Sequence, residues 1–383
     1  MGIYLKNSMR IIAIVGTRPE IIKMQPIIKE IQNSEHELIF VHTGQHYDYR
    51  MSDIFVDELE LPEPHYFLNV KPASQGAQTG EIIASCERIL KNENPDILLV
   101  QGDTNSALGA AIAASKLGLS IGHVEAGCRS FDKLMPEEIN RVLISDIANL
   151  HFAPTFNCKR NLLREGIVSQ IFLTGHPIVD LMGQIKDRIL NNDLKKLGAD
   201  HKSYALVTFH RRENIANKQK INDILVALDH LAQIIPVIFP CHPHTELQII
   251  EFAYKSYLKD LKVIQPVGYL DSLSLIKHAK FVLTDSGGIQ QEAALLGTPC
   301  ITLREVTEWV ETVNVGVNFL TGHRSSRIIK TVQHIERDYE NIVQRFNSVG
   351  NLFGKIGVSR RIIHAIEKTG MIMTKTKKAN MLQ

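Results

Sequence analysis

The sequence predicts an α/β protein built from two doubly wound parallel sheets. Short apolar runs rich in β-branched residues alternate with amphipathic segments along most of the 383 residues, which is typical of parallel strands covered by helices on both faces. The alternation pauses in a polar stretch at residues 180–203 and then resumes. A chain of this length corresponds to two or three domains, so we expect one sheet on each side of a linker near residues 185–202.

The first half contains six apolar runs that we expect to form strands. Helical patterns lie between them, including residues 19–32 and 104–118. We therefore assign residues 1–185 to an N-terminal domain. The six runs are RIIAIVG (10–16), HELIFVHTG (36–44), DILLVQGD (96–103), LSIGHV (119–124), NLHFAP (149–154) and QIFLTG (170–175).

Five further runs predict the strands of a second domain at residues 200–355. Each is short, apolar and followed by a polar or glycine-containing turn. They are YALVTFH (204–210), PVIFPCH (236–242), LKVIQPVG (261–268), AKFVLTDSGG (279–288) and TPCITL (298–303).

Composition excludes several classes of protein. The formal net charge is +2, which shows no bias toward nucleic acid or a membrane surface. No apolar run approaches the roughly 18 residues of a membrane span, and the first residues, MGIYLKNSM, lack the apolar core of a signal peptide. The five cysteines are scattered, without a CxxC pair, as expected in a reducing compartment. We therefore expect a soluble cytoplasmic protein that has neither a nucleic-acid nor a membrane partner.

Polar motifs follow five of the predicted strands. In a parallel sheet the carboxyl ends of the strands meet at one edge, and ligands bind there. Two such sheets would place an interdomain cleft between them. The motifs are GTRPE (16–20), GDTNS (102–106), EAGCRS (125–130), HRREN (210–214) and DSGGIQQE (285–292).

The DSGGIQQE motif is the most specific phosphate signal. A strand, a turn of Ser286, Gly287 and Gly288, and a helix would bring bare backbone N–H groups and a positive helix end to a pyrophosphate. Glu292 lies one helical turn further on, where a carboxylate could accept both hydroxyls of a ribose. The alternative is a tight turn followed by an ordinary helix.

The basic residues near the strand ends have two interpretations each. Arg18 could bind phosphate through two hydrogen bonds or be a loop arginine, and Lys23 could face the cleft or solvent. His210 follows a strand directly and could be a packing or capping residue, although Arg211 and Arg212 favour anion binding. The pairs His42/His46 and His242/His244 raise the question of a metal, but neither pair has a third ligand at a typical spacing, so we expect no metal.

Three carboxylates are candidates for acid/base chemistry. Glu125 is the first residue after a buried strand and precedes Ala-Gly. Asp103 has the same placement but could instead cap the next helix. Glu137 lies in the first turn of a helix that begins at Pro136, where acids suit the helix dipole, and its i,i+4 spacing to Arg141 allows a routine surface pair. The nearby Asp132, Lys133 and Glu138 read as solvated charge.

With its motifs taken in order, the chain resembles the non-hydrolysing UDP-N-acetylglucosamine 2-epimerases over residues 10 to 365. The resemblance rests on GTRPEIIKMQP, QGDTNS, GHVEAGCRS, MPEEINR, VTFHRREN and LTDSGGIQQEA. It implies the GT-B architecture, in which two Rossmann-like domains face a cleft. It also implies that a final helix at about 358–369 packs onto the first domain, followed by a basic tail, and that the protein is a homodimer without a cofactor.

The resemblance also implies a reaction and a set of site residues. The family interconverts UDP-GlcNAc and UDP-ManNAc, precursors for cell-surface polysaccharides, by eliminating UDP as the C2 proton leaves and adding it back to a glycal. Asp103, Glu125 and Glu137 would be the acid/base residues. His210 and Arg18 would face the diphosphate, Ser286, Gly287 and Gly288 would cradle it, and Glu292 would hold the ribose. Lys23 and His242 would be further cleft residues.

The chain departs from the family pattern at several positions. The aromatic residue expected near the uracil is Ser272 here, although Tyr269 lies close by in sequence, and a common arginine is replaced by Trp309. The segments CRSFDKLMPEE and TGQHYDYR differ from the bacterial pattern. Bacterial members use those surroundings to bind a second substrate molecule as an activator, so that regulation does not follow from the resemblance.

Four other functions compete with this interpretation. A GT-B glycosyltransferase would share the nucleotide site, but the carboxylate trio favours proton transfer. A catalytically silent sugar-nucleotide sensor would not need these acids. An epimerase of a modified sugar, such as a UDP-linked diacetamido uronic acid, differs only in the sugar pocket. The hydrolysing branch usually departs from TRPE and has a serine-rich phosphate turn, whereas this chain has both TRPE and SGG.

Overall fold

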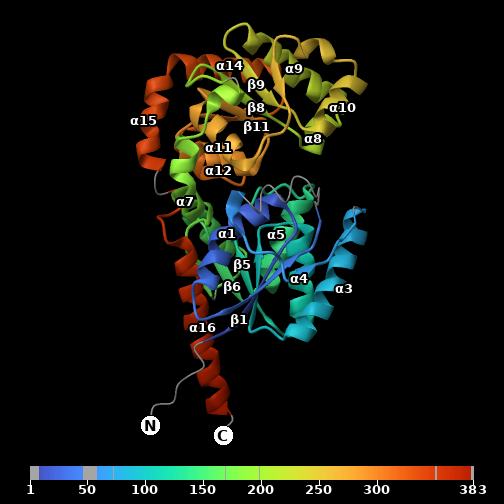
Figure 1. The fold of residues 1–383 in the computed structure, drawn as a ribbon, viewed down its shortest axis with the longest axis vertical. Coiled ribbons are helices and arrows are strands. Elements are labelled where there is room, and N and C mark those ends of the chain that lie inside the picture. Colours follow the sequence, from blue (N-terminus) through green and yellow to red (C-terminus); the bar gives the residue numbers. More distant parts are fainter. Residues whose placement is uncertain are drawn as a thin grey trace. The chain divides into compact units, whose positions relative to one another are not determined.

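The computed structural model describes residues 8–45, 58–71, 73–168, 170–197, 199–349 and 352–380. By its internal contacts the chain forms two units, shown in Figure 1. The first unit contains residues 1–184 and 353–383, and the second contains residues 185–352.

The first unit contains a parallel sheet of seven described strands in the order β3-β2-β1-β4-β5-β6-β7. The direction of winding reverses between β1 and β4, and this reversal point is where doubly wound sheets bind ligands. The strands are β1 (Arg10–Val15), β2 (Glu37–His42), β3 (Tyr66–Phe67), β4 (Ile97–Gln101), β5 (Ser120–Val124), β6 (Leu150–Ala153) and β7 (Ile171–Leu173).

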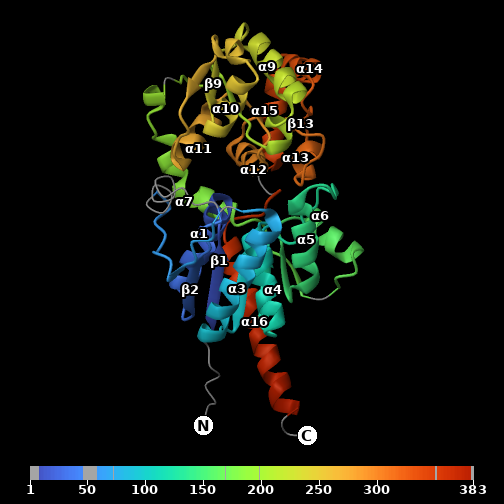
Figure 2. The same cartoon turned by 90° about the vertical axis from the view of Figure 1, so that its right-hand side faces the viewer.

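Helices cover both faces of this sheet, as Figures 1 and 2 show. They are α1 (Arg18–Gln32), α3 (Gln75–Glu93), α4 (Asn105–Lys116), α5 (Pro136–Ile147), α6 (Phe156–Arg164), α7 (Ile178–Leu190) and α16 (Val358–Asn380). The last helix packs against α1. Its start is fixed by Asp180, whose carboxylate accepts hydrogen bonds from the backbone N–H groups of Gly357, Val358 and Ser359. A carboxylate at this position also suits the positive end of the helix dipole.

The second unit repeats the same winding in a six-stranded parallel sheet of order β10-β9-β8-β11-β12-β13. Its reversal point lies between β8 and β11. The strands are β8 (Ala205–Thr208), β9 (Val237–Pro240), β10 (Lys262–Ile264), β11 (Phe281–Thr284), β12 (Cys300–Thr302) and β13 (Asn318–Leu320).

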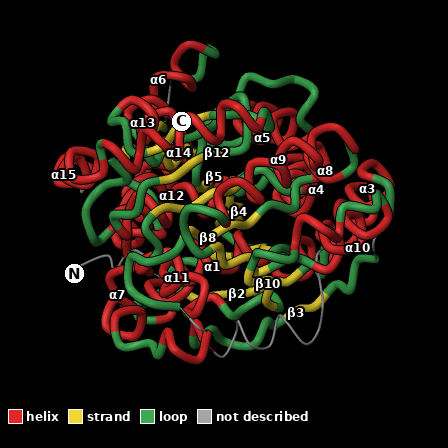
Figure 3. Tube along the Cα trace, turned by 90° about the horizontal axis from the view of Figure 1, so that it is seen from above, coloured by secondary structure: helices red, strands yellow, loops and turns green. Residues whose placement is uncertain are grey.

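Helices again lie on both sides of these strands, and Figure 3 colours the elements by type. They are η1 (Leu194–Leu197), α8 (Arg212–Ile215), α9 (Lys218–Ala232), α10 (Pro243–Glu251), η2 (Lys255–Leu258), α11 (Tyr269–His278), α12 (Gly287–Leu296), α13 (Val310–Asn314), α14 (Ser325–Arg337) and α15 (Tyr339–Val349).

Each unit has its own core, built from the continuous apolar strands and one face of each helix. In the first, Ile12, Ile14 and Val100 are fully buried against alanines of α4. In the second, Val207, Phe239 and Leu283 are buried against α9. Burial of both faces explains why the strand sequences are continuously apolar rather than alternating.

The predicted fold class of two Rossmann-like α/β units is confirmed. The short strands β3 and β13 were not predicted. Much of the predicted linker is helical, because α7 continues to Leu190 and η1 follows. None of the helices described has the length and apolar character needed to span a membrane.

Candidate active site

The polar motifs gather at the reversal points of the two sheets. In the first unit, GTRPE follows β1 and GDTNS follows β4, on the two sides of the reversal, and Glu125 follows the neighbouring β5. In the second unit, HRREN follows β8 and DSGG follows β11. Each set is therefore placed where this topology binds ligands.

Glu125 is held in an unusual backbone conformation. Its φ is +70°, in the left-handed region that side-chain-bearing residues rarely adopt. The turn continues through Gly127 at φ +82°, where a Cβ would lie 2.2 Å from the carbonyl oxygen of Cys158. Only glycine fits at Gly127, and the sharp turn directs Glu125 away from the continuing strand. Backbone strain of this kind is concentrated at functional sites.

Three donors converge on one oxygen of Glu125. Its Oε2 accepts hydrogen bonds from Lys23 Nζ at 2.6 Å, Gln101 Nε2 at 2.6 Å and His176 Nε2 at 2.8 Å. Burial would raise the pKa of Glu125, but Lys23 and His176 outweigh burial and lower the pKa to about 2. Burial would likewise lower the pKa of Lys23, which Glu125 raises above its ordinary value. The two residues therefore form a buried ion pair at neutral pH.

Asp103 pairs with Arg141, whose Nη2 lies 2.5 Å from Asp103 Oδ2. Burial raises the pKa of Asp103 despite Arg141, and the charges of Glu125 and Glu137 raise it further. These interactions show that the three predicted carboxylates lie near one another. Glu137 is half-buried in the first turn of α5. The structure thus brings Asp103, Glu125, Glu137 and Lys23 together in the first unit.

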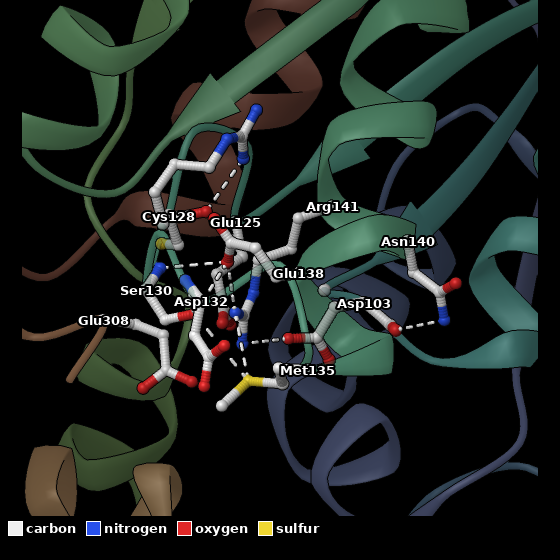
Figure 4. Close-up of polar contacts among 12 residues, drawn as sticks. Asp103, Glu125, Cys128, Ser130, Asp132, Met135, Glu138, Asn140, Arg141 and Glu308 are labelled. Atoms are coloured by element: carbon white, nitrogen blue, oxygen red, sulfur yellow. Dashed lines mark hydrogen bonds and ion pairs between the residues drawn. The ribbon is translucent and has the colours of Figure 1, made fainter. Parts of the chain in front are cut away.

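The expectation of solvated charge at Glu138 is wrong. Its side chain is buried and accepts hydrogen bonds from the backbone N–H groups of Ser130 and Phe131, from the Ser130 hydroxyl and from Arg141 Nη1. Figure 4 shows Arg141 joined to both Asp103 and Glu138. Glu138 therefore holds the loop before α5 and orients Arg141 toward Asp103.

Glu20 of the GTRPE motif is buried and turns toward its own loop. It accepts hydrogen bonds from the Gly16 N–H at 3.0 Å, the Thr17 hydroxyl at 2.9 Å and the Thr104 hydroxyl at 2.7 Å. Burial raises its pKa to about 7, although these hydrogen bonds oppose the rise. Glu20 therefore ties the start of α1 to the start of α4, and it occupies the Gly16 N–H that a phosphate would otherwise use. Arg18, two residues earlier, is half-buried at the start of α1.

Asp285 organises the loop that carries His210 in the second unit. Its fully buried carboxylate accepts hydrogen bonds from the backbone N–H groups of His210 and Arg211 and from Asn214 Nδ2 at 3.0 Å. The His210 side chain is 48% exposed, with Nδ1 3.8 Å from Asp285 Oδ1. The His210 and His242 rings are 6.1 Å apart. The structure thus brings these two predicted residues together.

The SGG turn presents backbone N–H groups, as the sequence predicted. Ser286 is the N-cap of α12, and Gly287 and Gly288 form its first turn, whose N–H groups have no acceptor within a helix. A Cβ on Gly287 would lie 3.6 Å from its nearest neighbour, and one on Gly288 would lie 3.9 Å away. Neither glycine is required by packing or by a positive φ, so the bare backbone is left for a ligand to approach.

Glu292 lies further along α12 and is buried beside Tyr269. Burial and the Glu292 carboxylate together raise the pKa of the Tyr269 hydroxyl. The Tyr269 side chain is only 4% exposed, which leaves little ring surface for stacking on a base. Trp309 is also buried, and its Nε1 lies near Gly287. Ser272 is half-buried on α11.

Of the candidate metal-binding pair His42 and His46, the structure describes His42. His42 is buried, stacks on Phe67 and accepts a hydrogen bond from the Gly44 N–H through Nδ1. His46 lies outside the described residues. Within the described ranges, no three His, Cys, Asp or Glu side chains group as metal ligands.

Sequence reasoning missed several residues of the site. His176 and Gln101 contact Glu125, Glu20 joins two helix starts, and Asp285 holds the His210 loop. Gln101, His176 and Asp285 lie at or just after strand ends, and Glu20 lies in the first turn of α1. His176 follows the run QIFLTG, so the rule that identified the other motifs would have identified it too.

Comparison with known proteins places the chain among sugar-nucleotide enzymes. Residues 29–367 match the family model described as UDP-N-acetylglucosamine 2-epimerase. The UDP-N-acetylglucosamine 2-epimerase of Methanocaldococcus jannaschii is 45% identical over 335 residues, covering 85% of this chain and 92% of the relative. The UDP-2,3-diacetamido-2,3-dideoxy-D-glucuronate 2-epimerase of Pseudomonas aeruginosa is 37% identical, covering 94% of this chain and all of the relative.

The fold is shared with a solved structure as well. The crystal structure of the Methanocaldococcus jannaschii UDP-GlcNAc 2-epimerase in complex with UDP-GlcNAc and UDP superposes with a TM-score of 0.84 at 41% identity. The match covers 94% of this chain and 99% of that one.

Proposed function

Because the chain belongs to the UDP-N-acetylglucosamine 2-epimerase family, an isomerase family, we propose that it interconverts UDP-GlcNAc and UDP-ManNAc. The observation that carries this proposal is the grouping of Asp103, Glu125 and Glu137 at the carboxyl edge of the first sheet. Inverting C2 requires a base on one face of the sugar and an acid on the other, and this cluster supplies more than one carboxyl group. We propose that residues 1–185 carry the acid/base residues, that residues 200–355 bind UDP, and that residues 356–383 form the helix that returns to the first domain and the basic tail.

The reaction we propose is elimination followed by re-addition. The C2 proton of UDP-GlcNAc is not adjacent to a carbonyl, so direct removal would leave an unstabilised carbanion. If the C1–O bond to UDP breaks as a carboxylate takes the C2 proton, the electron pair of the C2–H bond forms the C1=C2 double bond of a glycal. Addition of UDP to C1 and of a proton to the opposite face of C2 then gives UDP-ManNAc.

The environments of the carboxylates support different roles for them. Glu125 is held ionised by Lys23 and its other donors, whereas burial raises the pKa of Asp103. Paired carboxyl groups whose environments separate their pKa values are the usual arrangement for an acid and a base in one site. We therefore assign proton transfer at C2 to Asp103 and Glu137, with Glu125 as the fixed negative charge of the cluster.

The second unit supplies the groups we propose for UDP. The first-turn N–H groups of α12 at Gly287 and Gly288 suit the diphosphate, with Ser286 as the cap. His210 and His242 lie at the same edge, and His242 accepts the His244 N–H through Nδ1, so its Nε2 carries a proton to donate. Glu292 is proposed for the ribose. Arg18 of the first unit is proposed as a further cation for the diphosphate, whereas Lys23 is proposed to act through its ion pair with Glu125.

The other candidate functions differ in their products. A hydrolysing enzyme would release free ManNAc and UDP, and a glycosyltransferase would pass the sugar to an acceptor. The relative named for a diacetamido uronic acid is less similar than the one named for UDP-GlcNAc. A sensor would form no product, which leaves the three grouped carboxylates unexplained.

The reaction itself tests the proposal. Purified protein is incubated with UDP-GlcNAc, and the mixture is separated by ion-exchange chromatography at successive times. We expect UDP-ManNAc to accumulate to a constant ratio, and the same ratio to be reached from UDP-ManNAc. Free sugar as the main product, or turnover only of the diacetamido uronic acid, would contradict it.

We further propose a homodimer in the cytoplasm that serves cell-surface polysaccharide synthesis. Three apolar side chains of α5, Ile139, Val142 and Leu143, are exposed on one side of the helix, as expected of a surface covered by a second copy. The five cysteines are free and buried, which suits a reducing compartment. The molar mass in solution, measured by light scattering, tests the dimer.

A further inference from the structure

His176 lies at the centre of the contacts that fix Glu125, although it is distant from Glu125 in sequence. Its side chain is fully buried between β7 and α7. Its backbone N–H donates to the carbonyl oxygen of Phe353 at 2.7 Å, and its ring packs edge-on against the Phe353 ring. Its position is therefore set both by the loop after β7 and by the segment that returns to the first unit.

Gly175, the residue before His176, makes this packing possible. Gly175 has a φ of +87°, and a Cβ there would lie 2.9 Å from the Phe353 carbonyl oxygen and 3.2 Å from Gly354 Cα. Any side chain at this position would push the returning segment away. The Thr-Gly-His-Pro sequence is thus built to place His176 against Phe353.

Hydrogen bonding fixes the tautomer of the ring. Nδ1 accepts a hydrogen bond from the Ile178 N–H at 3.1 Å, so Nδ1 carries no proton. Nε2 then carries the proton and donates it to Glu125 Oε2 at 2.8 Å. Burial lowers the pKa of His176 against the raising effect of Glu125, so the ring is a neutral donor rather than a cation.

We propose that His176 is a positioning residue for the epimerisation: its Nε2–H, with Lys23 and Gln101, fixes Oε2 of Glu125. Oε1 receives none of these three hydrogen bonds, which leaves it as the oxygen presented to the sugar. The inference rests on the proposed function, because it assigns His176 to the same carboxylate cluster. In this arrangement His176 is a neutral donor that orients the Glu125 carboxylate and stabilises its ionised form without touching the substrate.

Six other titratable groups lie around Glu125, and a change in the pH dependence of kcat has to be distinguished from their titration. They come from α1, from the turn after β4, from β5, and from the turn after β5 with α5. They are Lys23, Asp103, His123, Cys128, Glu137 and Arg141. Removing the His176 donor leaves all of them in place, so a displaced acidic limb would follow from the change made at Glu125.

The test compares His176→Met with His176→Gln. Methionine fills the buried volume without a donor, whereas the glutamine Nε2 replaces the histidine Nε2. We expect His176→Met to lower kcat about 10- to 100-fold, the range for one hydrogen bond to a charged group, with little change in KM. The acidic limb of its kcat profile should move to higher pH because the Glu125 carboxylate has lost a donor. His176→Gln should restore both.

His151→Met is the matched control. His151 is also buried in the first unit, and its Nε2 bonds a backbone carbonyl, that of Ser145, at 2.8 Å. It should lose stability but keep the kcat and pH profile of the wild type. A purely structural role for His176 would give that same result for His176→Met, and this outcome would overturn the proposal.

A spectroscopic readout decides the case even if His176→Met does not fold. Nitrogen-15 NMR of the histidine side chains should show His176 protonated on Nε2 and unprotonated on Nδ1 throughout the pH range of the folded protein. A His176 ring protonated on Nδ1 would overturn the proposal. Absence of UDP-GlcNAc epimerisation by the wild type would instead contradict the proposed function, and the NMR result would still stand.

Discussion

At the scale of single residues, neighbouring acids in one helical turn have different surroundings. Glu137 and Glu138 both follow Pro136, and sequence physics favours a helix-dipole role for either. The structure separates them, because Glu138 is buried against Ser130 and Arg141 while Glu137 is half-buried beside Asp103. Sequence could not make this distinction, since it depends on how the loop at residues 130–135 folds back onto the helix.

Glu137→Gln is the clean test of a proton-transfer role. We expect kcat to fall about 100-fold or more with the thermal midpoint unchanged, because Glu137 is not among the buried structural acids. Glu138→Gln should instead lower the thermal midpoint, since it weakens the hydrogen bonds to Ser130, Phe131 and Arg141. Steady-state kinetics and calorimetry on both variants measure the contrast. Near-normal kcat in Glu137→Gln would mean that Glu137 interacts with the helix dipole and does not transfer the proton.

Glu125→Gln is a less direct test than Glu137→Gln. The substitution would leave the buried Lys23 ammonium without its counter-ion, and an unpaired buried charge costs about 3 kcal/mol or more. Any loss of activity in that variant would therefore combine chemistry with instability. The position of Glu125 after a buried strand was readable from sequence, but its ion pair with Lys23 across 102 residues was not.

At the scale of elements, periodicity predicted the strands that are buried on both faces. Runs such as those of β1, β4 and β11 are apolar throughout because helices cover both sides of each sheet. β3 has only two residues, too few for any pattern, and the polar Asn318 interrupts the apolar run at β13. α7 was read as linker because its exposed residues are polar, although its apolar side chains Leu181, Ile185 and Ile189 recur at helical spacing on one buried face.

The glycines of α12 give a prediction at this scale. Gly288→Ala adds a methyl group with room around it and replaces glycine by a better helix former, so stability should not fall. UDP should nevertheless bind less tightly, because the methyl group obstructs approach to the first-turn N–H groups.

Titration calorimetry with UDP measures this effect, and Gly80→Ala in α3 is the control. Gly80 also has open space around its Cβ position, and it lies within α3 of the first unit rather than in α12. Unchanged UDP affinity in Gly288→Ala would contradict binding of the diphosphate at the N-terminus of α12.

At the scale of the whole molecule, buried titratable groups set the response to acid. The pKa of His123 is lowered by burial to about 3 and that of His42 to about 4, from 6.5. Their stability contribution is present above about pH 6.5 and is lost as pH falls toward those values. Glu20 has the opposite sign, because its pKa is raised from 4.5 to about 7, so its contribution grows as pH falls to 4.5. Glu125, with a pKa of about 2, loses its contribution between pH 4.5 and 2.

These signs predict a two-part pH profile. Between pH 6.5 and 4.5 Glu20 offsets only one of the two histidines, so the free energy of unfolding should fall gradually. Below pH 4.5 the offset ends, and stability should fall steeply as His42, His123 and Glu125 act together. Urea unfolding at a series of pH values measures this, and a free energy of unfolding that rises below pH 4.5 would contradict it.

In the reaction we propose, the protein removes and replaces the proton on C2 of UDP-GlcNAc. The most direct measurement is to run the reaction in deuterated water and follow C2 by NMR. We expect UDP-ManNAc carrying deuterium at C2, and recovered UDP-GlcNAc that gains deuterium with time. The Glu137→Gln variant should slow both. UDP-ManNAc that retains the original C2 hydrogen, or no isotope entry at all, would contradict the proposed reaction.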